Sequence, residues 1–319
     1  MVRHSRRVRE VSMTSDVLSK SKMNVYSAVT QKIISAIEEG TGEYKMPWHV
    51  PAGQLTIPTN ALTKAEYRGV NVLGLWLEAV RNHYPSGFWA SYKQWKSMGA
   101  QVRHGERGAL VVFYRSQETQ PAEREDHDRS ADLRFFARAS WVFNAAQVEG
   151  FSEPKVEVKN EFARNREAEE FVKSVGAEVN HGFTMACYRP STDTIEMPHR
   201  EWFVGTSTSS AAESYYATIC HELTHWVGAP HRLNREFGKR FGDHAYAMEE
   251  LVAEIGSAFV CAALGITPEP RADHAAYVAS WLKILKQDNR AIFTAASKAQ
   301  EAFEHLAYLA MANRPPMDG

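Results

Sequence analysis

The sequence predicts an α+β fold arranged in two domains, and three observations support this prediction. The chain has 319 residues, which is more than one ordinary domain holds. Helical periodicity alternates with short strand-like segments before residue 150, whereas the chain after residue 166 is mostly helical. The charge also shifts, since residues 23–115 carry ten basic and six acidic side chains, while residues 151–319 carry 17 basic and 23 acidic ones.

The composition excludes several classes of protein. With 44% hydrophobic and 24% charged residues the chain can build a core, and its net charge of −1 indicates no particular partner. The cysteines are Cys187, Cys220 and Cys261, and their odd number and wide spacing exclude a disulfide scaffold and a cysteine zinc finger. No apolar run approaches the ~20 residues that span a bilayer, and the N-terminus lacks an apolar signal core. We therefore expect a cytoplasmic protein without membrane contacts.

Residues 1–22 show no sustained periodicity and carry six basic and two acidic side chains. We expect a disordered extension here, with Met13 and Met23 as alternative starts. A basic arm for nucleic acid is the other interpretation, although so short a tail rarely carries a function alone.

Residues 23–150 are predicted to form the first domain. Val29, Ile33 and Ile37 lie on one stripe at helical spacing, which indicates that the domain begins with a helix. The polar segment over residues 117–132 has no periodicity and is expected to be an exposed hairpin loop between two strands. The expected elements are helices over residues 24–39, 71–82 and 91–100 and strands over residues 101–103, 109–115 and 133–144.

Residues 151–165 indicate a linker, and residues 166–319 are predicted to form the second domain. A β-ribbon is expected from residues 187–189 and 194–197, because a turn sequence separates two short strand-like segments. The edge of this ribbon could pair with an extended peptide, and an ordinary packed hairpin is the equal alternative. The expected helices lie near residues 167–175, 210–227, 246–264, 273–287 and 290–311.

The most specific motif is His221-Glu222-Leu223-Thr224-His225. Two histidines four residues apart lie about 40° from each other on a helix, so both imidazoles can reach one metal ion. Apolar residues fill the opposite side of this helix and anchor it, which favours a metal site over a chance match. Glu222 is the expected general base, because a glutamate at this position can take a proton from an attacking water.

The third metal ligand has two alternatives. His231 fits the longer pattern H-E-x-x-H-x-x-G-x-x-H, in which a glycine turns the chain back toward the metal. Glu250 and Glu254 instead form a carboxylate pair on one face of a later, otherwise apolar helix. We favour Glu250 as the ligand and Glu254 as a carboxylate that orients a liganding histidine, with Glu254 or His231 as the alternative ligand. We expect Glu249 in solvent.

Two histidines and a carboxylate with one open position are a zinc arrangement of the catalytic type. Zinc is therefore the expected cofactor, and manganese is the other candidate. Such a metal polarises a carbonyl group and lowers the pKa of water. The sequence thus predicts a metallopeptidase site, for which it names no substrate.

Aromatic and basic residues interleave in the first domain. Aromatic faces stack unpaired bases and neighbouring cations hold phosphates, so this pattern predicts single-stranded nucleic-acid binding. Trp76 and Trp141 lie in apolar patterns and are expected in the core instead. The candidate DNA-binding residues are Trp48, Arg68, Trp89, Tyr92, Lys93, Trp95, Lys96, Arg103, Arg107 and Arg115.

Longer motifs add a family resemblance over nearly all of residues 24–312. They include YRGVNVLGLW, SYKQWKSMGAQVRHGERG and VFNAAQVEG in the first domain and SYYATICHELTHWVGAPHRLNR and YAMEELVAEIGSAF in the second. On these motifs the chain resembles the ArdC-type antirestriction proteins of conjugative plasmids. The resemblance implies an N-terminal domain that binds single-stranded DNA and a C-terminal zincin-like metallopeptidase domain, with the zincin roles falling on His221, Glu222 and His225. It also implies protection of incoming plasmid DNA from host restriction, with a host restriction-related protein as a candidate substrate.

Two other functions remain open. The chain could be a single-stranded-DNA-binding protein whose metal site is structural or catalytically silent. It could also be a cytosolic peptidase whose first domain grips protein. Retention of the general-base glutamate argues against a purely structural site, which more often uses four protein ligands.

Overall fold

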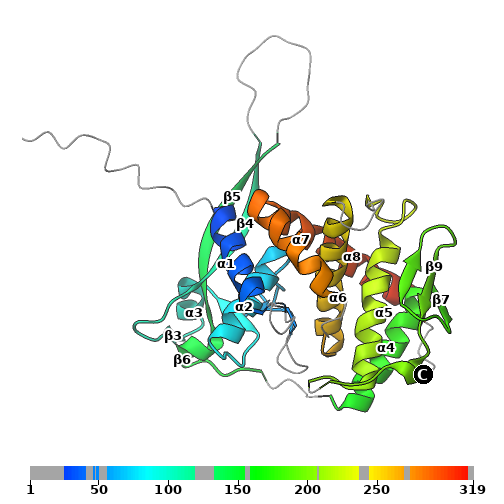
Figure 1. Cartoon of the computed structure of the whole chain (residues 1–319). Helices are drawn as coiled ribbons and strands as arrows, with labels where there is room; N and C mark the ends of the chain where they lie inside the picture. Colours follow the sequence, from blue (N-terminus) through cyan, green and yellow to red (C-terminus); the bar gives the residue numbers. More distant parts are fainter. Residues whose placement is uncertain are drawn as a thin grey trace, which may run out of the picture.

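The computed structural model describes residues 25–40, 46, 48, 49, 56–118, 133–154, 159–206, 208–236, 244–268 and 274–314. These residues form the predicted α+β fold (Figure 1). The predicted extension over residues 1–22 and most of the predicted hairpin loop lie outside the described residues. Below, the front half is the described part up to residue 154, and the back half is the described part from residue 159.

The front half combines short helices with a small sheet. Its four-stranded sheet has the order β1-β2-β5-β4, with β1 parallel to β2 and the other pairs antiparallel. The sequence did not indicate β1, β2 or β6, because strands of two or three residues show no alternation. The elements are α1 (Val25–Gly40), β1 (Thr59–Asn60), α2 (Val70–Arg81), β2 (Phe88–Ala90), α3 (Tyr92–Ser97), β3 (Gln101–Val102), β4 (Ala109–Glu118), β5 (Leu133–Asn144), η3 (Ala145–Gln147) and β6 (Val148–Glu149).

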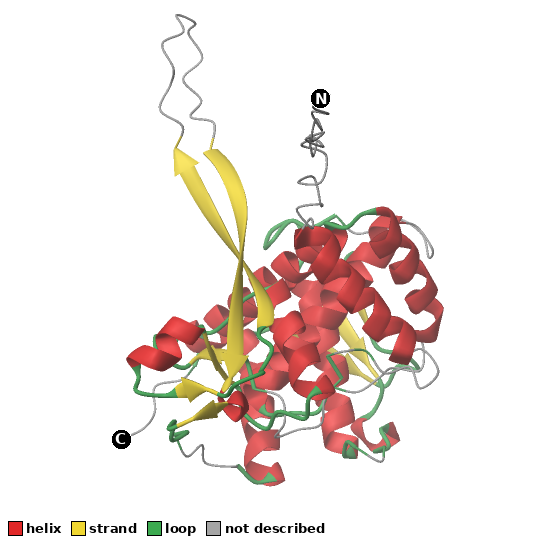
Figure 2. Cartoon of the chain, turned by 90° about the vertical axis from the view of Figure 1, so that its left-hand side faces the viewer, coloured by secondary structure: helices red, strands yellow, loops and turns green. Residues whose placement is uncertain are grey.

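Strands β4 and β5 form a long twisted ribbon that rises from the body of the molecule (Figure 2). Successive side chains point to opposite faces, so Val142 is buried while Trp141, which lies opposite Leu110, is 55% exposed. The prediction that Trp141 belongs to the core is therefore wrong. Trp76 on α2 is buried, as expected.

The back half is mostly helical with one three-stranded sheet of order β7-β9-β8. Helix α4 begins earlier than predicted, because the Asn160 side chain accepts a hydrogen bond from the backbone N–H of Ala163 and caps the helix. Residues 161–165 of the predicted linker are thus helical. The elements are α4 (Glu161–Val175), β7 (Glu178–His181), β8 (Cys187–Arg189), β9 (Thr194–Met197), η4 (Arg200–Trp202), α5 (Ala211–Val227), α6 (His244–Leu264), α7 (His274–Gln287) and α8 (Ala291–Ala312).

A hydrophobic core cluster spans both halves, beside a separate cluster within each half. Helix α6 contacts α5, α7 and α8, and these helices lie side by side in Figure 1. The largest cluster of buried apolar side chains joins α1, α2, β2 and β4 of the front half to α6, α7 and α8 of the back half. Across this seam the ring of Trp76 lies 5.7 Å from that of Phe259. A large hydrophobic interface of this kind opposes independent motion of the halves.

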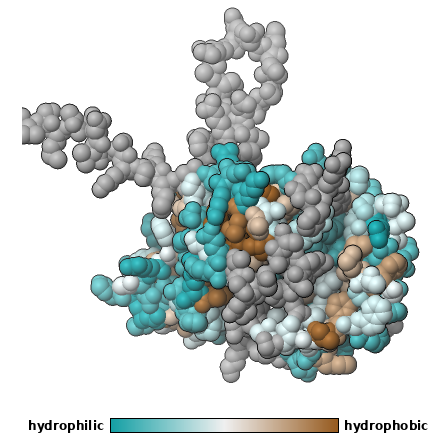
Figure 3. Space-filling model, in the orientation of Figure 1, coloured by the Kyte–Doolittle hydropathy of each residue, from teal (hydrophilic) through white to brown (hydrophobic). Residues whose placement is uncertain are grey.

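The face drawn in Figure 3 is mostly hydrophilic or of intermediate hydropathy, with a hydrophobic patch near its middle. Among the described helices, none combines the length and hydrophobicity that crossing a membrane requires.

Candidate metal centre

Helix α5 carries the histidine motif. Ser210 begins the helix with a capping box, in which its hydroxyl accepts from the N–H of Glu213 and the Glu213 carboxylate accepts from the N–H of Ser210. Leu223 and Ile219 are fully buried against the back-half core. The opposite side of the helix faces α6, and this orientation brings the histidines toward the glutamates of that helix.

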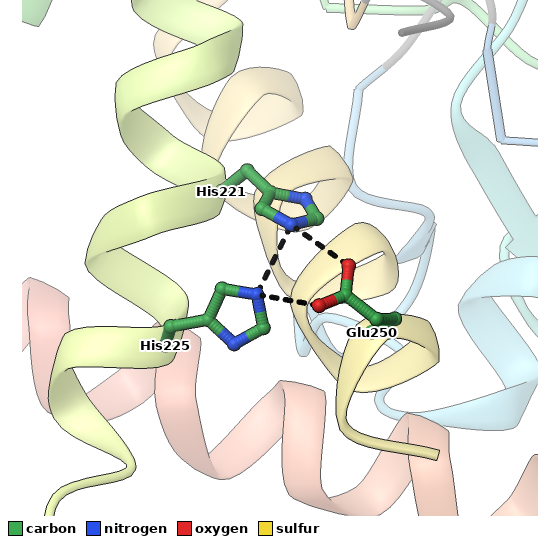
Figure 4. Close-up of side chains that lie close together, drawn as sticks. All are labelled: His221, His225 and Glu250. Carbon is green, nitrogen blue, oxygen red and sulfur yellow. Dashed lines mark hydrogen bonds and ion pairs between the residues drawn. The ribbon is translucent and has the colours of Figure 1, made fainter. Parts of the chain in front are cut away.

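The structure brings His221, His225 and Glu250 together, with one ligand atom of each within 4.8 Å of the others (Figure 4). The two Nε2 atoms lie 3.2 Å apart, and the Glu250 oxygens lie 3.6 Å from Nε2 of His221 and 3.5 Å from Nε2 of His225. Two imidazoles and one carboxylate are a donor set that suits zinc, and imidazole and carboxylate groups also bind manganese. The residues present therefore fit a divalent metal.

Glu222 is almost completely buried beside this cluster. Its Oε2 atom accepts a hydrogen bond of 2.9 Å from the backbone N–H of Tyr188 in strand β8. Because β8 is an edge strand of its sheet, this bond places the outer edge of the sheet directly at Glu222.

Glu249 lies outside the ligand set but is part of the centre, and the expectation that it faces solvent is wrong. Its Oε1 atom lies 3.1 Å from Nδ1 of His225, and Arg235 donates to both carboxylate oxygens at 2.7 and 3.0 Å. Burial raises the pKa of Glu249, but the hydrogen bonds from His225 and Arg235 outweigh burial and hold the pKa below its ordinary value. No sequence pattern indicates this role, because the burial of Arg235 beside Glu249 is set by tertiary packing.

Glu254 approaches the other histidine. Its Oε2 atom lies 3.7 Å from Nδ1 of His221, an ion-pair distance longer than the 3.1 Å between Glu249 and His225, so a carboxylate faces the Nδ1 atom of each histidine. The ring protons are then expected on Nδ1, and the two Nε2 lone pairs face each other. Two facing lone pairs repel each other, and a cation between them would remove this repulsion. This is a further reason that the site fits a metal.

His231, the alternative third ligand, is not brought to the histidine pair. It is 61% exposed, and its Nε2 atom lies 3.2 Å from Oδ2 of Asp193. Arg232 pairs with the same aspartate. The turn that follows Gly228 therefore directs His231 toward the β8–β9 turn.

Three of the predicted DNA-binding residues belong to the core. Trp48, Trp89 and Trp95 are buried, so the prediction that they stack bases is wrong in this structure. Burial of a tryptophan requires a partner for its indole N–H, and Trp95 donates 3.0 Å to the carbonyl of Phe143.

The other predicted DNA-binding residues are on the surface where the structure describes their side chains. Tyr92, Lys93 and Lys96 on α3 are exposed, as is Arg107. Two arginines are exposed but paired, Arg68 with Glu304 and Arg103 with Glu106. Arg115 lies in β4, but its side chain is outside the described residues.

A cavity of about 1040 Å³ lies between the ribbon, the start of α2 and α8. Its lining is rich in amide and hydroxyl groups, and Phe113 of β4 contributes an aromatic ring that is 46% exposed. Arg138 lies opposite Phe113 in the β4–β5 register. The polar groups that line the cavity include Asn60, Glu66, Arg68, Gln94, Ser140, Ser297, Gln300 and Glu301.

The fold and the metal centre together define a two-domain protein whose back half is of the zincin-like metallopeptidase class. Two family matches agree: a zincin-like metallopeptidase family, MPTase-PolyVal, matches residues 166–298, and the N-terminal domain of anti-restriction factor ArdC matches residues 23–143. The chain belongs to the ArdC-type antirestriction family.

Relatives of known sequence or structure support this assignment. The uncharacterized protein y4eC of Sinorhizobium fredii (strain NBRC 101917 / NGR234) is 46% identical over 91% of this chain and 93% of its own length. A DNA primase TraC of Escherichia coli is 35% identical over 89% of this chain, which spans only 27% of that protein.

Two crystal structures of the antirestriction protein ArdC from plasmid R388 have the same fold and are 35% identical to this chain. The metal-free structure has a TM-score of 0.72 and covers 92% of this chain and 100% of its own. The Mn(II)-bound structure has a TM-score of 0.69 and covers 90% and 98%.

Proposed function

We propose that this chain is an antirestriction protein that binds single-stranded DNA, carries a divalent-metal peptidase site and protects incoming plasmid DNA during conjugation. The observation that carries the proposal is the cluster of His221, His225 and Glu250 with Glu222 beside it. Membership of the ArdC family supports the biological role. A protein that acts on incoming DNA works in the cytoplasm, and a host restriction-related protein is the candidate substrate.

The residues of the centre divide into metal ligands and a general base. His221, His225 and Glu250 would hold zinc, or manganese as in the R388 relative. A metal bound there would polarise a substrate carbonyl and lower the pKa of water. Glu222 acts as general base and passes the proton to the leaving amine, while the N–H of Tyr188 fixes the orientation of its carboxylate.

The position of strand β8 is an argument that the substrate is a peptide. The N–H of Tyr188 points away from the sheet toward Glu222, so the edge of β8 runs beside the general base. An extended peptide that adds to this edge would place a carbonyl group near the catalytic glutamate.

Glu222→Gln tests the catalytic half of this proposal. The amide keeps the size and the bond to Tyr188 but cannot accept a proton, so we expect metal binding to persist and activity to fall by at least about 10²-fold. The measurements are the metal content of purified protein and protection of a transferred plasmid in a restricting host. Unchanged protection by a Glu222→Gln variant would exclude peptidase chemistry from the antirestriction role.

One observation favours the second candidate, a DNA-binding protein with a structural metal site. His221 and Glu222 are each only 3% exposed, so a peptide reaches the centre only if neighbouring segments move. If Glu222→Gln keeps its metal and its protection, and metal removal lowers the melting temperature, the structural role is supported.

The cavity beside the ribbon is the proposed site for single-stranded DNA. Phe113 can stack an unpaired base, the hydroxyl groups of Ser140 and Ser297 can bond its edge, and Arg138, opposite Phe113, can supply a cation for a phosphate. Because phosphate contacts release counterions, affinity should fall as salt rises.

The test is fluorescence anisotropy with a labelled single strand. Phe113→Ala should weaken binding by about 1–3 kcal/mol, which is the contribution of one stacked base. Phe162→Ala is the matched control, because Phe162 is an exposed phenylalanine on α4, a helix that does not line the cavity. Binding that is insensitive to salt and to Phe113→Ala would favour a front half that grips protein.

A further inference from the structure

Glu254 connects the metal centre to the front half of the chain. Its Oε1 atom accepts a hydrogen bond of 3.2 Å from Nε1 of Trp48 and lies 2.6 Å from Nε2 of His49. Its Oε2 atom faces Nδ1 of His221 at 3.7 Å. One carboxylate thus joins a metal-ligand candidate to residues more than 200 positions earlier in the chain.

The direction of these hydrogen bonds follows from the surroundings of His49. The backbone N–H of Met46 donates to Nδ1 of His49 at 3.0 Å, so Nδ1 is an acceptor without a proton. The ring proton is therefore on Nε2, and His49 donates to Glu254. Trp48 has only a donor, so both front-half residues donate to the same carboxylate oxygen.

Burial makes the Glu254 carboxylate depend on its hydrogen-bond donors. The side chains of His49, Glu254 and His221 are 3%, 5% and 4% exposed. A carboxylate in so dry an environment is costly unless hydrogen bonds compensate it, and loss of one donor leaves it undercompensated. With Oε1 held by two N–H groups, Oε2 is the oxygen that faces Nδ1 of His221, at an ion-pair distance of 3.7 Å that is longer than a hydrogen bond.

We propose that Trp48 and His49 are positioning residues of the metal centre, which act through Glu254 on the orientation of His221; this inference rests on the metal site proposed above. The consequence is that metal affinity depends on the front half, although the front half supplies no ligand. Loss of a group that orients a metal-binding histidine costs about 10–100-fold in metal affinity. Binding energies are reciprocal, so metal should in turn stabilise the contact between the halves.

The experiment measures metal binding by the full chain after metal removal. Zn(II) and Mn(II) are titrated calorimetrically, and the visible spectrum of the Co(II) form reports the ligand geometry. We expect Trp48→Phe and His49→Leu to raise the Kd by about 10–100-fold and to change the Co(II) spectrum. His49→Gln should recover most of the affinity, because its amide N–H can replace the donor at Nε2.

Trp76→Phe is the matched control. It also removes an indole N–H at the seam between the halves, but this group donates 2.9 Å to the carbonyl of Thr56 and not to Glu254. We expect a lower melting temperature with an unchanged Kd and spectrum. If His49→Leu fails to fold, the Kd and Co(II) spectrum of Trp48→Phe, compared with those of Trp76→Phe, still test the inference.

Two results would overturn the inference. One is wild-type affinity and spectrum in both the Trp48→Phe and His49→Leu variants. The other is equal weakening by Trp76→Phe, which would assign the effect to general packing. A wild-type chain that binds neither Zn(II) nor Mn(II) would instead overturn the proposed metal site itself.

Discussion

The two histidines of the metal centre have similar positions but are held by different parts of the chain. His225 faces Glu249, and Glu249 is held by the charged side chain of Arg235, from the same half of the molecule. His221 faces Glu254, and Glu254 is held by the neutral donors of Trp48 and His49 from the other half. Both carboxylates belong to α6, so the comparison shows that the carboxylate behind an imidazole can be held by a local cation or by neutral donors from across the domain seam.

The difference has an energetic consequence. An ion pair buried within one half is costly to break, because the remaining charge stays in a dry environment. Neutral donors bond a buried carboxylate less strongly but avoid burying a second charge. The ion pair behind His225 should therefore govern the stability of the back half. The hydrogen bonds to Glu254, behind His221, should govern how the front half affects metal binding.

The largest effect should come from breaking the local ion pair. Arg235→Met leaves Glu249 buried without its cation, so we expect the free energy of unfolding to fall by about 3–5 kcal/mol. Urea unfolding of the metal-free chain measures this change. Arg103→Met is the control, because its exposed pair with Glu106 should contribute at most about 1 kcal/mol. If the two variants were equally stable, the buried pair of Glu249 and Arg235 would have no special role in stability, and the contrast between the surroundings of His225 and His221 would fail.

An intermediate effect should appear as coupling between pairs of substitutions. If His49 acts through Glu254, His49→Leu should weaken metal binding in a Glu249→Gln background as much as in the wild type. In a Glu254→Gln background it should add little, with a coupling energy of about 0.5–3 kcal/mol between contacting residues. Calorimetric titration with Zn(II) measures each Kd. Equal additivity in both backgrounds would place the action of His49 elsewhere.

Local geometry predicted each pair of residues in the cluster, and the preference for Glu250 over His231 came from the two-carboxylate face of an otherwise apolar helix. A four-residue spacing fixes the angle between His221 and His225, and the same rule placed Glu250 and Glu254 on one face of a second helix. The sequence did not predict the role of Glu249, because its burial depends on where the turn after α5 delivers Arg235. The contact of His49 with Glu254 depends on tertiary packing between the halves, which no local pattern records.

The tryptophans show the same limit in the front half. Aromatic residues next to lysines are typical both of a nucleic-acid surface and of a core with solvated edges, and Trp95 belongs to the second kind. The apolar neighbours of Trp141 predict a core position, but the two-residue period of β5 places this residue on the outer face. A strand with one buried face needs its register before its aromatics can be assigned.

The smallest effect is expected at His231, the ligand candidate that the structure directs elsewhere. Its side chain is 61% exposed and pairs with Asp193, and Arg232 also holds this aspartate. Because exposed pairs contribute about 0–1 kcal/mol, His231→Ala should leave both the melting temperature and the Kd for Zn(II) close to wild type. Glu250→Ala, measured in the same titration, should instead remove a ligand and abolish tight binding. If His231→Ala weakened binding as strongly as Glu250→Ala, the third ligand would come from the turn after α5, and the carboxylates of α6 would all act behind the histidines.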